Sequence, residues 1–171
     1  EGYDRAATLP SAGFSAGPCL LKDTMQLAAF DINNFLLGHA AMMINEGLPG
    51  FLVEDLKKRY DLTKTKVGIL GMAFKADIDD IRDSLSFKLG KILRFNGADV
   101  YYSDEFAKNP DFISKEKLIE TCNVIIVAVP HSNYKGIIIP ENVEVVDLWG
   151  VVKGGKRETP KGYTASDKVK K

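Results

Sequence analysis

The chain has 171 residues, of which 45% are apolar and 27% charged, and its 23 Lys and Arg residues balance 23 Asp and Glu residues. The length suits one domain with an appendage, and the zero net charge argues against a protein that binds nucleic acid or an acidic membrane. The longest apolar run, Val124 to Pro130, is too short for a membrane span, and the two distant cysteines form no paired metal motif. We therefore expect a cytoplasmic protein that holds no metal and contacts neither nucleic acid nor membrane.

The first 60 residues predict a loop followed by helices. Residues 1–18 are rich in Gly, Pro, Ala and Ser and begin without Met, so we interpret the chain as a piece of a larger protein. Residues 24–46 predict one long helix in which only Asp31 and Glu46 are charged, and Pro49 predicts the start of a second, amphipathic helix. A domain of this size cannot cover so apolar a helix, so we expect a further domain or a partner subunit to bury it.

The next segment alternates between strands and helices. Strands are predicted at 66–74, 98–104, 123–130 and 142–150, and helices at 82–97 and 115–122. This order predicts an α/β fold with a Rossmann-like parallel sheet, whose ligands bind beyond the carboxyl ends of the strands. Those ends carry Phe74 and Lys75, Ser103 and Asp104, Pro130 and His131, and Trp149. Residues 153–171 contain seven Lys or Arg and predict a basic, poorly ordered tail.

The segment after the first strand carries weak motifs. Gly68 and Gly71 have G-x-x-G spacing, which differs from the dinucleotide fingerprint G-x-G-x-x-G and is weak evidence for NAD binding in this domain. Lys75 suits a phosphate contact as well as it suits an ordinary surface lysine. Aspartates crowd around Arg82, and we attribute them to helix capping and to the orientation of Arg82 rather than to a metal site. These are Asp77, Asp79, Asp80 and Asp83.

A thiol and a carboxylate lie four residues apart at the start of the long helix. Cys19 is placed where the Gly-rich loop meets the helix, and Asp23 follows one helical turn later. This pair suits covalent catalysis, with the carboxylate as a base or as a group that orients water. An ordinary buried cysteine is the alternative from these residues alone.

Together, the segments GFSAGPCLLKDTMQL and VGILGMAFKADIDDIRDS, with the long apolar helix between them, resemble the UDP-glucose/GDP-mannose dehydrogenase family. VAVPHSNYKG and VEVVDLWG extend the resemblance to about residue 150. The resemblance implies NAD-dependent oxidation of a nucleotide sugar at C6, a central helix that forms a homodimer, and a C-terminal domain that binds a UDP-sugar. It also implies that an N-terminal NAD domain and the family's catalytic Lys and Asn lie outside this chain.

The resemblance assigns roles to individual residues. Cys19 matches the nucleophile that forms a thiohemiacetal and then a thioester, and Asp23 matches the aspartate that assists it. Lys22 and Arg82 match positions near NAD. The substrate-binding positions are Arg5, Gly13, Phe14, Ser15, Ala16, Gly17, Phe74 and Lys75. The family's Gly-Gly pair before the cysteine is Ala16-Gly17 here, and its Arg near the last strand is not evident, so the sugar is not identified.

The sequence thus predicts three regions. Residues 1–60 form the catalytic-cysteine loop and central helical region, residues 61–152 form the nucleotide-sugar-binding domain, and residues 153–171 form the tail. The leading interpretation is the C-terminal part of a nucleotide-sugar 6-dehydrogenase, which on its own would not turn over substrate. The alternative is a non-catalytic nucleotide-binding or dimerisation module on the same scaffold.

Overall fold

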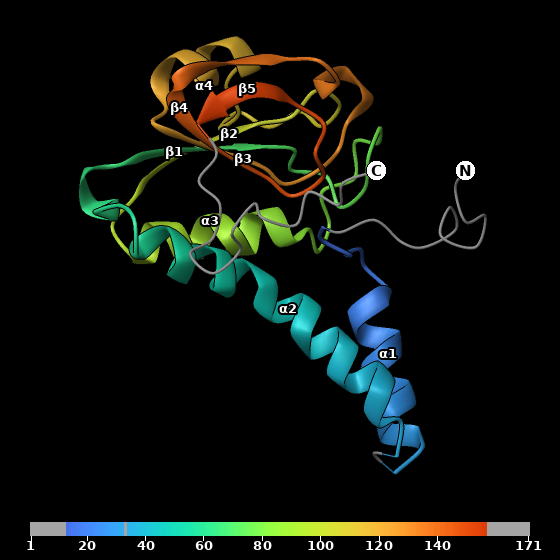
Figure 1. The fold of residues 1–171 in the computed structure, drawn as a ribbon. Helices are drawn as coiled ribbons and strands as arrows, with labels where there is room; N and C mark the ends of the chain where they lie inside the picture. The colour runs from blue at the N-terminus through green and yellow to red at the C-terminus, as the bar shows by residue number, and fades with distance from the viewer. Residues whose placement is uncertain (1–12, 33, 157–171) are drawn as a thin grey trace, which may run out of the picture.

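The protein consists of an α/β sheet domain from which a pair of helices projects (Figure 1). The structure is a computed structural model that describes residues 13–32 and 34–156. The helices are α1 (Leu20–Phe30), α2 (Leu36–Lys57), α3 (Leu85–Phe95) and α4 (Lys115–Thr121), with 3-10 turns η2 (Leu62–Lys64) and η3 (Ser132–Tyr134). The strands are β1 (Lys66–Leu70), β2 (Asp99–Ser103), β3 (Val124–Val127), β4 (Ile138–Asp147) and β5 (Lys153–Lys156).

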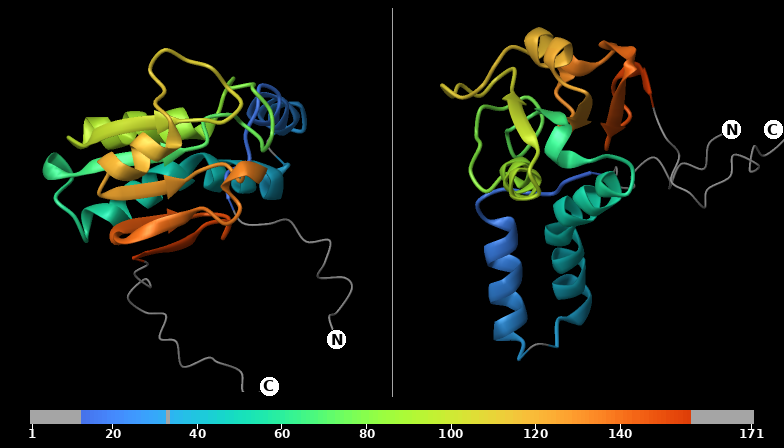
Figure 2. Two further views of the ribbon diagram at one scale, coloured as in Figure 1. Left: turned by 90° about the horizontal axis from the view of Figure 1, so that it is seen from above. Right: turned by 90° about the vertical axis from the view of Figure 1, so that its left-hand side faces the viewer.

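The five strands form one sheet in the order β2-β1-β3-β4-β5, and every neighbouring pair is parallel. The predicted parallel α/β sheet is therefore confirmed. Helices α2 and α3 cover one face of the sheet and α4 covers the other (Figures 1 and 2). Alternate residues of a strand point to opposite faces, so Val67 and Ile69 pack in the core with α2 and α3, while Leu70 packs with Leu118 of α4. Four of the five residues of β1 and all four of β3 are buried, as expected for central strands of a parallel sheet.

The predicted helix over 24–46 is wrong, because the chain turns between α1 and α2. Asp31 and Asn34 are residues that favour turns, and Ile32 adopts a φ of 48°. The predicted helix start at Pro49 is also wrong, because α2 continues through this residue. Proline removes one helical hydrogen bond, but Pro49 is buried and the apolar residues Val53 and Leu56 beyond it pack into the core. Tertiary packing therefore maintains the helix across the proline.

The sheet extends further than the sequence predicts. Residues 153–156, placed in the tail by the sequence, form strand β5 beside β4. Gly154 and Gly155 occupy this strand with φ of 68° and 73°, so the segment lacks the β-branched residues that identify a strand. The rest of the predicted tail and residues 1–12, which include Arg5, lie outside the described residues.

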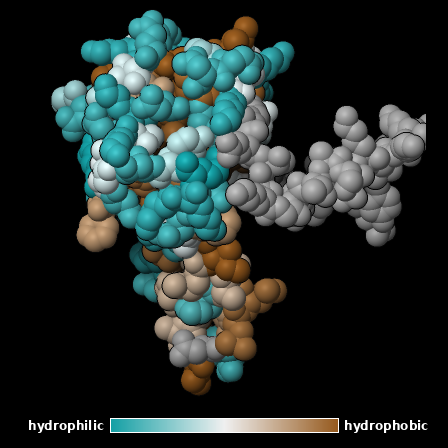
Figure 3. All heavy atoms as spheres, turned by 60° about the vertical axis from the view of Figure 1, so that its left-hand side comes forward, coloured by the Kyte–Doolittle hydropathy of each residue, from teal (hydrophilic) through white to brown (hydrophobic). Residues whose placement is uncertain are grey.

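The helical pair leaves many apolar side chains in contact with solvent. Ala28 is the buried residue of α1, while Phe30 is 88%, Ile32 83% and Leu37 84% exposed. Figure 3 shows these hydrophobic side chains gathered along the projecting helices. The described part of the chain does not supply the cover that the sequence led us to expect.

The G-x-x-G motif is explained by packing at both glycines. A Cβ on Gly68 would collide with the side chain of Leu118 in α4. A Cβ on Gly71, where φ is 92°, would lie 2.5 Å from Cβ and 2.9 Å from the backbone N of Val129. The two glycines thus allow α4 and the loop after β3 to approach β1 closely.

We expect Gly71→Ala to lower the free energy of unfolding by at least about 2 kcal/mol, because it adds both left-handed strain and a clash with backbone atoms. Gly47→Ala is the matched control. Gly47 lies in α2 with nothing within 4 Å of the added Cβ, so alanine should raise stability by about 0.5–1 kcal/mol. Urea unfolding followed by circular dichroism measures both, and equal effects would contradict the explanation.

Candidate active site

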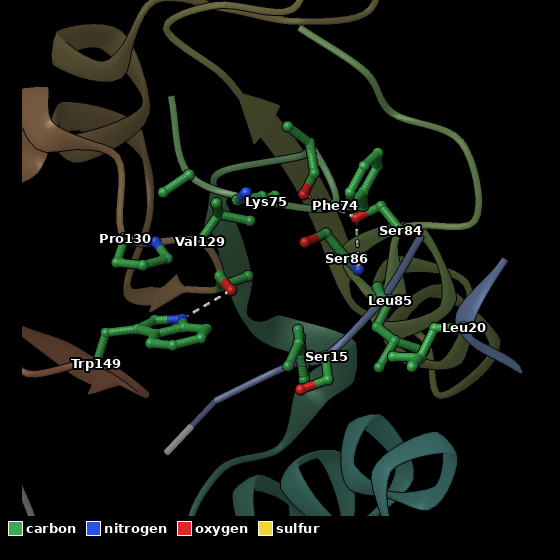
Figure 4. A pocket seen from close by; sticks show the side chains of 15 residues that line it. Ser15, Leu20, Phe74, Lys75, Ser84, Leu85, Ser86, Val129, Pro130 and Trp149 are labelled. Carbon is green, nitrogen blue, oxygen red and sulfur yellow. Dashed lines mark hydrogen bonds between the residues drawn. The ribbon is translucent and has the colours of Figure 1, made fainter. Parts of the chain in front are cut away.

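A cavity of about 350 Å³ opens beyond the carboxyl ends of β1, β3 and β4 (Figure 4). This is the edge at which the sequence predicts ligand binding. The cavity is lined by the loop before α1, the loop after β1, the start of α3, the loop after β3 and an aromatic side chain after β4. The lining residues include Phe14, Ser15, Ala16, Leu20, Phe74, Lys75, Ser84, Ser86, Pro130 and Trp149.

The segment from Gly13 to Gly17 forms one wall of the cavity, and contacts at both ends fix its path. Gly13 lies so close to Trp149 that a Cβ would overlap the indole ring, and a Cβ on Gly17 would lie 3.1 Å from the ring of Phe74. Both glycines have φ near 130°. Between them, Ser15 is held by Asn45 of α2, whose side chain accepts a hydrogen bond from Ser15 N (2.9 Å) and donates one to Ser15 O (2.6 Å). The contacts at both ends and at Ser15 therefore fix the position of this backbone wall.

Phe74 and Lys75 form the opposite wall, on the loop that follows β1. Phe74 N donates a hydrogen bond to Asp80 O (3.0 Å), and the side chains of both residues line the cavity. Lys75 is exposed and, among the described residues, has no carboxylate within ion-pair distance. It is therefore a cation available to an anionic ligand.

One hydroxyl group in the cavity wall lacks a partner. Ser86 is completely buried and its Oγ makes no hydrogen bond within the described part of the chain. Figure 4 shows this hydroxyl pointing toward the cavity near Lys75. By contrast, Ser84 Oγ caps α3 by accepting from Ser86 N and donates to Ala73 O. A buried hydroxyl without a partner is costly, so Ser86 suits a contact with a bound ligand.

The loop that carries Phe74 and Lys75 is fixed by a buried carboxylate. Asp104, after β2, accepts hydrogen bonds from Met72 N (2.6 Å) and Ala73 N (3.0 Å) through Oδ2, and from Phe106 N and Ala107 N (2.8 Å each) through Oδ1. His131, after β3, lies 3.0 Å from the same Oδ2 through its Nε2. The ends of three strands therefore meet at one side chain.

The tautomer of His131 follows from its second nitrogen. Nδ1 accepts a hydrogen bond from Asp77 N (2.9 Å), so the proton of the neutral ring is on Nε2 and is donated to Asp104. Burial raises the pKa of Asp104, but the bonds from His131 and from backbone N–H groups outweigh burial and hold that pKa well below its usual range. The sequence located Asp104 and His131 at strand ends but assigned them no role.

We expect Asp104→Ala to lower the free energy of unfolding by about 3–5 kcal/mol, since it leaves His131 and several buried N–H groups unpaired. Asp111→Ala, at an exposed position, should change stability by less than about 0.5 kcal/mol. Because the folded-state pKa of Asp104 is depressed, its contribution is complete above the unfolded value of 3.8 and is lost as pH falls below it. The difference between wild type and Asp104→Ala in urea unfolding should therefore shrink below about pH 4. A difference that is unchanged at pH 3 would contradict this assignment.

Cys19 occupies the N-cap position of α1, where Asp23 N donates a hydrogen bond to Cys19 O (2.8 Å). The thiol is free and exposed, which excludes the ordinary buried cysteine considered from the sequence. Asp23 pairs with Lys22 at 2.8 Å, and the pKa of Lys22 is raised first by this bond and also by interaction with Cys19. The other cysteine, Cys122, is buried, and burial raises its pKa to about 12.

Arg82 lies on the same side of the molecule as Cys19. Its guanidinium bonds to both oxygens of Asp80, from Nε to Oδ1 (3.0 Å) and from Nη2 to Oδ2 (2.6 Å), and these bonds lower the pKa of Asp80 to about 2. The pKa of Arg82 is raised, mainly by Asp80 and to a smaller extent by Cys19. The expectation that an aspartate orients Arg82 is therefore confirmed for Asp80. Lys22 and Arg82 therefore both lie within electrostatic reach of Cys19.

A second cavity of about 520 Å³ lies on the other side of the Ser15–Ala16 segment. Lys22, Lys88 and Lys91 line it, and so do Pro18 and Leu20, the two neighbours of Cys19. Ser15, Ala16, Leu20, Ser84 and Leu85 line both cavities and separate them. Of the described residues with predicted substrate roles, the first cavity is lined by Phe14, Ser15, Ala16, Phe74 and Lys75. Gly17 and Lys22 line the second cavity.

The described residues contain neither a candidate metal site nor a candidate membrane span. No group of three or more His, Cys, Asp or Glu residues is placed to hold a metal ion. No helix in 13–32 or 34–156 is long and apolar enough to cross a membrane.

Comparison with known proteins agrees with the fold. The structure of a UDP-glucose dehydrogenase from Pyrobaculum islandicum superposes with a TM-score of 0.70 at 26% identity, over 84% of this chain and 37% of that one. A GDP-mannose dehydrogenase from Pseudomonas aeruginosa shares the fold, with a TM-score of 0.72 at 20% identity, over 88% of this chain and 41% of that one. The UDP-N-acetyl-D-mannosamine dehydrogenase of Pyrococcus horikoshii is 31% identical over 126 residues, which are 71% of this chain and 30% of the relative. The UDP-glucose 6-dehydrogenase of Haloferax volcanii is 34% identical over 123 residues, which are 62% of this chain and 29% of the relative.

The parallel sheet with a cavity at its carboxyl edge places the domain in the doubly wound α/β class. The model of the UDP-glucose/GDP-mannose dehydrogenase family, UDP binding domain, matches residues 68–154. The chain belongs to this family, as the sequence resemblance predicts. It spans about 30% of the length of the curated relatives it matches.

Proposed function

We propose that the chain is the C-terminal part of an NAD-dependent nucleotide-sugar 6-dehydrogenase that oxidises a UDP-sugar to a UDP-uronate. The observation that carries this proposal is the position of Cys19. A free, exposed thiol directly follows the loop that forms one wall of a cavity, and Lys75 lies on the opposite wall. A thiol next to a cavity lined by a cation suits covalent chemistry on the sugar of a nucleotide sugar.

In this proposal, some residues bind the substrate and others take part in bond formation. Lys75 pairs with the diphosphate, and Phe74 packs against the sugar, whose C6 then points along the loop toward Cys19. The Cys19 sulfur adds to C6 once it is an aldehyde, which gives a thiohemiacetal and, after a second oxidation, a thioester. Asp23 orients the water that hydrolyses the thioester and releases the carboxylate.

NAD, when bound, accepts the hydride in both oxidations. The G-x-x-G motif of this chain is explained by packing, so we assign most of the NAD contacts to a region outside the chain. Lys22 and Arg82 fit contacts with the cofactor, because both are exposed cations coupled to Cys19.

We expect iodoacetamide to alkylate Cys19 and to spare Cys122, which is buried and has a raised pKa. UDP-glucose should slow the alkylation by occupying the cavity, and the C6 aldehyde of UDP-glucose should slow it more, by adding to the thiol. Lys75→Ala should raise the concentration needed for protection about tenfold, since a charge-assisted contact is lost. Peptide mass spectrometry of the full chain measures the modification of both cysteines.

Lys108→Ala, a change at an exposed lysine outside both cavities, is the control and should leave protection unchanged. Equal protection by UDP-glucose and by its C6 aldehyde would contradict the covalent role of Cys19 and leave a nucleotide-binding module. Absence of protection by any UDP ligand would contradict the whole proposal.

We also propose that a second copy of the chain covers the projecting helices. The exposed apolar side chains of α1 and of the first part of α2 lie away from the sheet domain, so no described segment covers them (Figures 1 and 3). Two identical apolar surfaces bury each other in a symmetric dimer, which is the commonest arrangement of soluble oligomers.

We expect the chain to sediment as a dimer, and the double variant Phe30→Glu/Leu37→Glu to sediment as a monomer, since it places charges on the surface that the partner would bury. Phe95→Glu is the matched control. Phe95 is 92% exposed at the end of α3, on the sheet domain, and its replacement should leave the dimer intact. A stable wild-type monomer in sedimentation velocity would disprove the dimer.

A further inference from the structure

Trp149 is held rigidly at one end of the first cavity. It is the sole tryptophan of the sequence. Its Nε1–H donates to Ala128 O (2.9 Å), and its backbone N–H donates to Asp147 Oδ1 (3.1 Å). The backbone of Gly13 presses against its six-membered ring. Despite these contacts the side chain is only partly buried and lines the cavity.

The residues that line the cavity follow one another in a fixed order, which the contacts of the loop before α1 define. Gly13 contacts Trp149, Gly17 contacts Phe74, and Cys19 follows two residues later. Gly13 and Gly17 are the two ends of this wall, so Trp149 and Phe74 lie toward opposite ends of it. Figure 4 shows the same order, with Trp149 and Pro130 at one end, Leu20 at the other and Lys75 between them.

A nucleotide sugar is also linear, with the sugar at one end, the diphosphate in the middle and the nucleoside at the other end. If the sugar points to Cys19 and the diphosphate meets Lys75, then the nucleoside falls at Trp149. This step rests on the proposed function, because it uses the assignment of Cys19 as the reacting group.

We propose that Trp149 is the platform on which the nucleobase of the substrate stacks. The Nε1–H, its hydrogen-bond donor, is already bonded to Ala128 O, so the indole offers the ligand a ring face and no hydrogen bond. A ring face attracts every base, because each base has its own π-face. The indole therefore supplies affinity for the nucleoside without selecting uracil, and its rigid position lowers the entropic cost of binding.

The test compares two variants of the full chain by calorimetry with UDP, GDP and pyrophosphate. Trp149→Phe and Trp149→Leu both lose the bond to Ala128 O and both keep an apolar side chain, but only phenylalanine keeps a ring face. We expect the leucine variant to bind UDP and GDP about tenfold more weakly than wild type, and the phenylalanine variant to remain within about threefold. Pyrophosphate, which has no base, should bind all three proteins equally.

Each other outcome overturns the inference. If wild type and Trp149→Leu bind UDP equally, Trp149 is not a platform for the base. The proposed function stands in that case if the protection of Cys19 by UDP-glucose still depends on Lys75. If both variants lose the same affinity for UDP, the loss comes from the missing hydrogen bond to Ala128 O and not from the missing ring face. A parallel loss of pyrophosphate binding indicates a damaged cavity rather than a lost base contact. Wild-type protein that binds neither UDP nor pyrophosphate overturns the inference and the proposed function together.

Discussion

The site depends on one buried carboxylate. Asp104 collects hydrogen bonds from the loop after β1, from its own loop after β2 and from His131 after β3. Without an anion at this point, the backbone N–H groups of Met72 and Ala73 would be buried without partners, and such groups are costly. Phe74 and Lys75 follow directly, so their positions are set by a residue about 30 positions away in sequence. Lys75, the cation that faces the cavity, is therefore positioned by the hydrogen bonds of Asp104 at the strand ends and not by contacts of its own side chain.

The opposite wall, formed by the backbone of residues 13–17, is also positioned by residues that are distant in sequence. Gly13 and Gly17 allow the loop to lie directly on two aromatic rings, and Asn45 bonds to both backbone groups of Ser15. An amide side chain is suited to this task, because it donates and accepts at once. The resulting cavity is mostly apolar and has polar groups at only a few positions. This composition is usual for a site that binds a small organic ligand.

The sequence predicted the parallel sheet because the apolar residues follow clearly different patterns in the strands and in the intervening helices. It failed where tertiary contacts decide the local structure. Pro49 ends a helix by local rules, yet the buried Val53 and Leu56 keep α2 intact, and Gly154 lies in a strand that only its neighbour β4 stabilises. The contacts of Asp104 with the loop after β1 and of Asn45 with Ser15 were not predictable either, because these partners are distant in sequence and are backbone atoms that carry no residue-specific pattern.

The helices that project from the sheet domain are also the helices that build the site. Cys19 is the N-cap of α1, and Asn45, which holds the loop at Ser15, lies in α2. The two helices contact each other, and a further cavity of about 530 Å³ between them reaches from Asp23 to Asn45. A partner that packs on their exposed apolar faces would therefore contact the two helices that carry Cys19 and the residue that fixes the loop at Ser15. Covering this apolar surface would also remove the cost of its contact with water.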